Sequence, residues 1–308
     1  MKEITIPNLK IKVPDGSPFT YETKPELMKC HQNCLVVAPR GQGKTTFVVN
    51  LIERMEYDRI FVCSPSIKSN HALLSRLKLE EDDIFEDVDD IGCLSVIKAA
   101  IEKERDDLEK YEDDKKKYRE LMKLLSADNV VSNSTAAGGS ANISDELLLK
   151  FYRDGVFEPP SHRWGGRRCQ IAVLFDDCMG SQIFTKGIRQ LNAMTIYHRH
   201  LGQLKAGGAL GCSLYFLCQS YKAQSGGISK CIRGNTTSLA IGRTKSEKEL
   251  DDIAEECGAE VPKETFLKIH TQATKDSKFD FLLIDFHRKD HHLSMFRRNL
   301  DVFLIPEN

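Results

Sequence analysis

The sequence predicts an α/β protein whose sheet is doubly wound, mostly parallel and covered by helices on both faces. Three observations indicate this fold class. Short apolar runs recur along the 308 residues. Their nearly continuous hydrophobicity is typical of strands buried on both faces. Helical patterns lie between the runs, as in a chain that alternates strands and helices. The length allows one large domain or two modest ones.

The predicted strands are apolar runs rich in β-branched residues or cysteine and bounded by turn residues. In chain order they cover residues 34–38, 59–64, 171–175, 212–218, 237–242 and 279–286. An amphipathic helix follows the first strand, because its apolar residues share one helical face: Phe47, Val48, Leu51, Ile52 and Met55. Another helix follows the fifth strand, with Ser246 as its N-cap and Gly258 at its end.

The stretch between the second and third strands is unusually long. Residues 94–125 have a charged helical pattern, and residues 126–142 resemble a flexible linker in composition. We therefore expect a lead-in over residues 1–30 and a single domain over 31–308, with a helical and flexible insertion at about 90–160. The charged helix is interpreted as a solvated face, or as an arm that contacts a neighbouring subunit or a partner.

Composition sets limits on the kind of protein. The net charge is −1, from 44 basic and 45 acidic residues, so the surface as a whole does not indicate a nucleic-acid binder. Ten cysteines lie mostly in apolar runs, which indicates a reducing compartment rather than a disulfide scaffold. We find no targeting signal and no apolar run long enough for a membrane helix, so we expect a soluble intracellular protein without membrane contact.

The stretch "APRGQGKT" is the strongest motif. A buried strand leads into a glycine-containing turn and then into an amphipathic helix, which is the setting of a phosphate-binding loop. Gly41 and Gly43 permit backbone geometry in which successive N–H groups point at phosphate oxygens. Lys44 is expected to reach the β and γ phosphates and Thr45 to coordinate magnesium. The full predicted ATP-binding segment is Ala38, Pro39, Arg40, Gly41, Gln42, Gly43, Lys44, Thr45 and Thr46.

Two acidic residues follow the apolar run of residues 171–175. Asp176 stands at the carboxyl end of a predicted buried strand, where it would hold Mg²⁺ together with Thr45. Asp177 is predicted to act as the base that polarises the attacking water, with a purely structural role as the alternative. Gln219 ends the next apolar run and is predicted to sense the γ phosphate, unless it only caps the following turn.

With these motifs the chain resembles the poxvirus-type DNA-packaging ATPases of large DNA viruses, within the FtsK-HerA superfamily of P-loop motors. The resemblance covers residues 34–245 apart from the insertion. It rests on "APRGQGKT", "RIFVCSPS", "VLFDDCMG", "RHLGQL" and "FLCQSYKAQSGGISKCIRGNTT". It implies a P-loop NTPase with a RecA-like sheet that hydrolyses ATP with Mg²⁺.

The resemblance also implies an oligomeric ring that drives double-stranded DNA into a preformed capsid, with a capsid or portal protein as a partner. The expected location is the virus assembly site in the host cytoplasm, or the virion. In such rings an arginine of one subunit completes the neighbour's site. The candidates are Arg233 and Arg199, with a slight preference for Arg233.

DNA contact is expected from basic residues near the channel, and phosphate contacts should dominate because a motor must grip any sequence. The candidates are Arg163, Arg167 and Arg168 near Trp164, together with Lys186, Arg189 and Lys205.

Two other functions remain open. A GTP-binding switch would use "DCMG" (residues 177–180), although Thr244 and Glu247 stand where guanine recognition needs Asn and Asp. A non-catalytic nucleotide-binding scaffold is the second alternative. Metal sites are disfavoured at Cys30, His31 and Cys34, which have no second ligand pair. A metal site is equally disfavoured in "HRKDHH" (residues 287–292), which is predicted to be an exposed turn.

Overall fold

The computed structural model describes residues 21–132, 149, 151–155, 157–222, 227–244, 246–257 and 261–306, with the backbone alone at 125–132 and 257. Residues 1–20 of the expected lead-in therefore lie outside the described residues. The predicted helix end at Gly258 also lies outside them. Ser246 caps the helix after the fifth predicted strand, since its Oγ accepts a hydrogen bond from the Glu249 N–H.

The described strands form one nine-stranded sheet in the order β3-β2-β4-β5-β1-β6-β7-β8-β9. The first six strands of this order are parallel, and β7, β8 and β9 continue the sheet in antiparallel pairing. The predicted fold class is confirmed. In chain order the strands are β1 Asn33–Val37, β2 Arg59–Cys63, β3 Ile84–Phe85, β4 Ile171–Phe175, β5 Ser213–Cys218, β6 Ser238–Ile241, β7 Leu282–Asp285, β8 Phe296–Arg298 and β9 Val302–Leu304.

Six of these strands coincide with the six predicted apolar runs, although β1 begins one residue before its run, at Asn33. Three short strands, β3, β8 and β9, were not predicted. Strand β7 is shorter than the predicted run of residues 279–286, because the chain still turns before it. The Asp280 carboxylate accepts a hydrogen bond from the Ser277 N–H and closes that turn. Phe279 and Asp280 therefore precede the strand.

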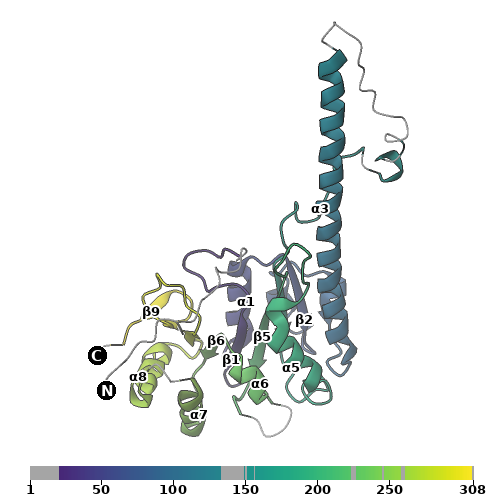
Figure 1. Ribbon diagram of the computed structural model, residues 1–308. Coiled ribbons are helices and arrows are strands. Elements are labelled where there is room, and N and C mark those ends of the chain that lie inside the picture. Colours follow the sequence, from purple (N-terminus) through teal and green to yellow (C-terminus); the bar gives the residue numbers. More distant parts are fainter. Residues whose placement is uncertain are drawn as a thin grey trace, which may run out of the picture.

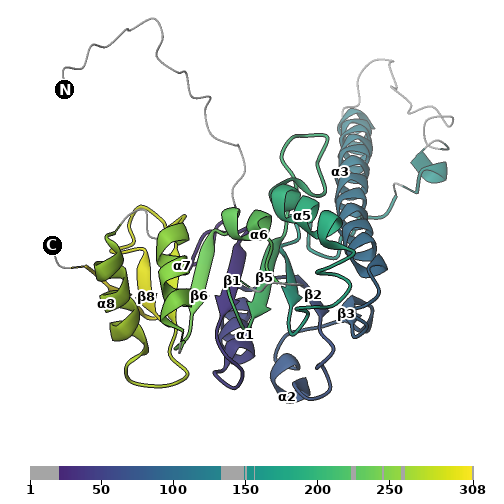
Figure 2. The same ribbon diagram turned by 90° about the horizontal axis from the view of Figure 1, so that it is seen from below.

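Helices cover both faces of the sheet (Figures 1 and 2). One apolar layer joins the sheet to α1 and α2, and the other joins it to α3, α5, α6, α7 and α8. The helices are α1 Lys44–Met55, α2 His71–Leu74, α3 Gly92–Ser132, α5 Ile188–Tyr197, α6 Lys230–Gly234, α7 Glu247–Cys257 and α8 Lys263–Thr274, with 3₁₀ turns η2 Glu81–Asp83 and η3 His198–His200.

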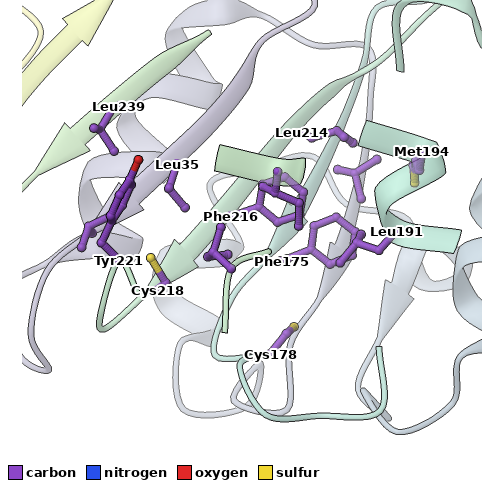
Figure 3. Close-up of a cluster of buried hydrophobic side chains, with 14 of the residues drawn as sticks. Leu35, Phe175, Cys178, Leu191, Met194, Leu214, Phe216, Cys218, Tyr221 and Leu239 are labelled. Atoms are coloured by element: carbon purple, nitrogen blue, oxygen red, sulfur yellow. The ribbon is translucent and has the colours of Figure 1, made fainter. Parts of the chain in front are cut away.

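The centre of the second layer is aromatic. Phe175 of β4 and Phe216 of β5 stack with ring centroids 5.0 Å apart, and Leu191 and Met194 of α5 belong to the same cluster (Figure 3). Phe175 immediately precedes Asp176, so this cluster fixes the strand end that carries the acidic pair.

Helix α3 is the feature that departs most from a compact sheet domain. It has 41 residues, which at 1.5 Å per residue gives a length of about 60 Å. Its distal half stands clear of the sheet (Figure 1). The prediction of a linker from residue 126 was wrong for residues 126–132, because α3 continues to Ser132. Within the described residues, no helix is long and apolar enough to cross a membrane.

The base of α3 is held by buried charge. Arg59, at the start of β2, forms ion pairs with Asp83 at 2.7 Å and with Glu104 of α3 at 3.0 Å. The indole N–H of Trp164 donates to Glu104 at 2.7 Å. Farther along the helix, Phe151 packs on Leu121.

Candidate functional site

The turn between β1 and α1 has the backbone of a phosphate loop. Gly41 and Gly43 have φ angles of 78° and 80°, in the left-handed region that favours glycine. Gly43 is the N-cap of α1 and supplies no side-chain cap. The first N–H groups of this 12-residue helix therefore have no side-chain acceptor, and they form an anion site at the positive end of the helix.

Lys44 folds back over the loop. Its Nζ donates to the carbonyl oxygens of Ala38 at 2.8 Å and Pro39 at 3.3 Å. Burial lowers the pKa of Lys44, while Asp177 and Asp176 act in the opposite direction. The amine thus lies between two carbonyl groups and near an acidic pair, where a phosphate anion would stabilise its charge.

Asp176 faces the loop from the end of β4. The hydroxyl of Thr45 donates to its carboxylate at 3.0 Å. Burial raises the pKa of Asp176 to about 6, with a further contribution from the negative charge of Asp177. Asp177 has a φ of 53°, an uncommon conformation outside glycine. Residues far apart in the sequence therefore meet at one point.

The sheet order explains where Gln219 lies. Strand β5 pairs with β1 on one side and with β4 on the other. Its carboxyl end is therefore between the phosphate loop and the acidic pair. Gln219 lines the same cavity of about 330 Å³ as Lys44, Thr45, Asp176 and Asp177. A loop and sheet arranged in this way make a P-loop NTPase fold.

Residues after β2 also line this cavity, and sequence reasoning assigned them no role. Ser66 Oγ donates to Asp177 at 3.4 Å, and the Asn70 amide donates to Ser66 Oγ at 3.2 Å. Ser69 and Leu73 complete that wall. The available signal was the parallel direction of β2, whose carboxyl end must reach the same edge of the sheet as that of β4.

The remaining loop residues contact β6 or solvent. Gln42 donates to the Arg243 carbonyl at 2.6 Å. A Cβ added at Gly242 would lie 2.7 Å from the Cβ of Ala38, so the small side chain at position 38 fits a close approach of β1 and β6. Arg40 and Thr46 are exposed at the rim of the cavity.

Both candidate trans arginines lie at the amino edge of the sheet, opposite the phosphate loop. The carbonyl of His198, next to Arg199, accepts from the Cys212 N–H just before β5. Arg233 lies in α6 just before β6, where it is bonded to Glu256 at 2.9 Å and to the Ile228 carbonyl. Neither arginine reaches the loop of its own chain.

The predicted DNA contacts divide into two groups. Arg163 pairs with Glu80, Arg167 with Asp58, and Lys205 with Glu109. Arg168 donates to the Gly207 carbonyl at 3.2 Å. In contrast, Lys186 and Arg189 are exposed near the start of α5, and they have no acidic partner within salt-bridge distance in the described part of the chain.

The disfavoured metal sites stay unsupported. Among the described residues, no group of three or more His, Cys, Asp or Glu side chains is arranged to hold a metal ion. His31 Nε2 lies 2.9 Å from the Leu210 carbonyl. The prediction that "HRKDHH" is exposed was wrong for His292, which is buried because its ring bonds the Pro25 carbonyl and Arg297.

The residues at the positions where a GTP-binding switch would recognise guanine are poorly suited to that role. Thr244 Oγ1 donates to Glu249 at 2.9 Å, and Glu247 begins α7. The structure does not test nucleotide preference, so this alternative stays a prediction.

No protein-family model and no curated protein matches this sequence. Solved structures are similar at low identity. The genome packaging NTPase B204 from Sulfolobus turreted icosahedral virus 2, in complex with AMP, is 10% identical with a TM-score of 0.42, over 88% of this chain and 97% of that chain.

Two other solved structures have similar TM-scores. The pCW3 conjugation coupling protein TcpA with ATPγS is 15% identical with a TM-score of 0.41, over 94% of this chain and 71% of that chain. VirB4 of Thermoanaerobacter pseudethanolicus is 12% identical with a TM-score of 0.39, over 89% and 90%. Similarity at this level says nothing about substrate or partner.

Proposed function

We propose that this protein is a magnesium-dependent ATPase that translocates double-stranded DNA, acting as an oligomeric ring that packages a viral genome into a preformed capsid. The observation that carries the ATPase part is the hydrogen bond of 3.0 Å between Thr45, at the start of α1, and Asp176, at the end of β4. It brings the two predicted magnesium ligands together beside Lys44.

The residues at this point suit a Mg²⁺ ion bound to phosphates. The donors are a hydroxyl and a carboxylate, the oxygen ligands that Mg²⁺ prefers. Burial penalises the negative charge of Asp176 and raises its pKa, and a divalent cation would offset that penalty. When bound, the ion would neutralise part of the negative charge of the phosphates. Thr45 and Asp176 would hold it.

Each other residue has a role in this proposal. Lys44 would exchange its carbonyl partners for β and γ phosphate oxygens. Asp177 would orient the attacking water as base, supported by Ser66, and Gln219 would contact the γ phosphate from β5. Because Arg199 and Arg233 are remote from the loop of their own chain, either one would act on a neighbouring subunit of the ring.

The DNA-translocating part of the proposal rests on the motifs shared with packaging ATPases. The exposed Lys186 and Arg189 are the basic side chains best suited to a duplex phosphate backbone, since no acidic partner in the described residues neutralises them.

The experiment is ATP hydrolysis by the full chain, with and without long duplex DNA, beside Lys44→Ala. We expect magnesium-dependent hydrolysis that duplex DNA stimulates several-fold and that the substitution abolishes. Indifference to duplex DNA would leave an ATPase without the translocase function. Undiminished biological function of Lys44→Ala would favour a scaffold. A GTP preference of several hundred-fold would favour a switch.

A further inference from the structure

A second and larger cavity opens on the other side of the phosphate loop. Its volume is about 950 Å³, within the range of small-molecule sites. Gly43 and Thr46 line both this cavity and the one that contains Asp176. The two cavities therefore meet at the loop.

The order of groups along the loop gives a bound triphosphate its direction. Asp176, Asp177 and Gln219 lie in the smaller cavity, which marks the γ end. Lys44 serves the β and γ phosphates and the loop N–H groups serve the α and β phosphates. The α phosphate must then lie toward Thr46, and the group attached to it leaves toward the larger cavity.

The larger cavity has an aromatic wall at this exit. Phe279 lies so close to the loop that a Cβ added at Gly43 would be 3.2 Å from its ring. The ring is nevertheless 54% exposed. The Lys278 ammonium lies over one face of the ring, with Nζ 4.8 Å from the ring centroid, so a ligand would stack on the opposite face.

The position of Phe279 is fixed by its neighbours. The Asp280 carboxylate accepts from the Ser277 N–H at 2.9 Å and from the Asn299 amide at 2.9 Å. Asn299 in turn accepts from the Phe281 N–H at 2.9 Å. These bonds hold the turn before β7 in one conformation, so Phe279 forms a preorganised wall.

The lining of the cavity is mixed: some polar side chains bond one another, and charged groups that include Arg297 and Asp301 also line it. Asp280 and Asn299 bond one another as described. The Asn50 amide donates to the Thr46 carbonyl, and its oxygen accepts from Arg54. Apolar groups such as Leu27, Leu300 and Phe47 make up much of the remaining lining. The aromatic wall beside the loop therefore offers stacking to a base, and the cavity also contains charged side chains.

We propose that the larger cavity binds the nucleoside of the triphosphate, that the base stacks on Phe279, and that the site prefers purines to pyrimidines. This inference rests on the proposed nucleotide binding at the loop. A purine is favoured because its fused rings present more stacking area than a pyrimidine.

The test is equilibrium binding with Mg²⁺ of ATP, GTP, CTP and inorganic tripolyphosphate to the full chain and to Phe279→Ala and Phe279→Trp. We expect Phe279→Ala to weaken the binding of ATP and GTP about 5- to 140-fold, which is the range of one base–aromatic stack. Tripolyphosphate affinity should stay unchanged, and Phe279→Trp should bind ATP as the wild type does. Tyr152→Ala, at another exposed aromatic residue, is the control for the loss of a surface ring.

Several outcomes separate this inference from the proposed function. An unchanged ratio of ATP to tripolyphosphate affinity in folded Phe279→Ala would overturn the stacking role while the phosphate site stood. Equal affinity for CTP and ATP would overturn purine selection by stacking. A wild-type chain that bound neither ATP nor tripolyphosphate would refute both the inference and the proposed function.

Discussion

Single residues decide the chemistry of the site, and burial is what makes them unusual. Lys44 and Asp176 carry opposite charges at the end of a buried sheet. Desolvation lowers the pKa of Lys44 and raises the pKa of Asp176, so it favours the neutral form of each. The Thr45 hydroxyl is the contact between the loop and Asp176. A ligand that brings both negative phosphates and a cation offsets both penalties.

The Thr45 hydroxyl can be tested by an isosteric change. Thr45→Val keeps the shape but removes the ligand oxygen, and Thr45→Ser keeps the oxygen. We expect Val to lower magnesium-dependent hydrolysis about 100-fold or more, as loss of one positioned polar group does elsewhere, and Ser to stay within about 10-fold. Steady-state rates across Mg²⁺ concentrations measure this. Equal rates for the two variants would contradict the role of the hydroxyl.

His31 gives the fold a predicted dependence on pH. Burial lowers the pKa of His31 from 6.5 to about 4, and the nearby His198, Arg199 and His200 act in the same direction. Above pH 6.5 neither state binds the proton. Between pH 6.5 and 4 the unfolded chain binds it and the folded chain does not, so stability falls as the pH falls.

The expected loss from His31 is about 2 kcal/mol between pH 7 and pH 5. Urea unfolding at the two pH values measures it. His31→Asn is the control, because Asn tolerates the φ of 58° at this position. The variant should lose less stability than the wild type over this interval, and an equal loss in both proteins would assign the pH dependence to other groups.

At the scale of elements, the two parts of α3 differ: its base is packed on the sheet, and its middle is exposed. Its first turns belong to the apolar layer of the sheet through Leu94, Ile97 and Ile101. The middle of the helix is charged and largely exposed, and its own buried apolar residues there are Leu108 and Leu121. Tertiary packing rather than intrinsic propensity therefore stabilises the base of the helix.

This division predicts very different costs for two neighbouring substitutions. Ile101 is completely buried and Val96 is 51% exposed. We expect Ile101→Ala to lower the free energy of unfolding by about 2 to 5 kcal/mol, because it leaves a cavity. Val96→Ala should change it by about 0.5 kcal/mol or less. Denaturant unfolding compares them, and similar costs would mean that α3 does not belong to the core.

At the scale of the whole molecule, the parallel sheet brings the carboxyl ends of β1, β2, β4 and β5 to one edge, where the proposed nucleotide site lies. The opposite edge carries Arg199 and Arg233. The phosphate loop and the two arginines therefore lie on different faces of the chain, which is the polarity that the proposed head-to-tail ring would require.

The proposed duplex contact predicts a difference between exposed and paired cations. Lys186→Ala and Arg189→Ala should each weaken duplex binding and reduce the slope of log K against log salt by about 1. Arg167→Ala should have a smaller effect, since Asp58 already pairs with Arg167. Titrations at several salt concentrations and with unrelated sequences measure this. Binding that tracked one short sequence would contradict the translocase.

The sequence by itself predicted part of the elements, together with the residues proposed for the site. The alternation of apolar runs and helical patterns predicted six strands, and Gly41, Gly43 and Lys44 predicted a phosphate-binding turn. Both predictions use local periodicity and backbone constraints, which act over a few neighbouring residues. The same reasoning placed Asp176 and Gln219 at strand ends. Sequence reasoning ended α3 too early, at residue 125. The polar and small residues that follow resemble a linker in composition, but the helix continues through them from its packed base.

The tertiary structure decided which strand ends meet. Only the order β4-β5-β1 places Gln219 between the loop and Asp176, and only the fold brings Ser66 to Asp177 and Phe279 to Gly43. The Ser66–Asp177 contact and the approach of Phe279 to Gly43 each join residues more than 100 positions apart in the sequence. Sequence periodicity carries no information about such pairs, because they arise from the pairing of strands across the sheet and not from the local chain.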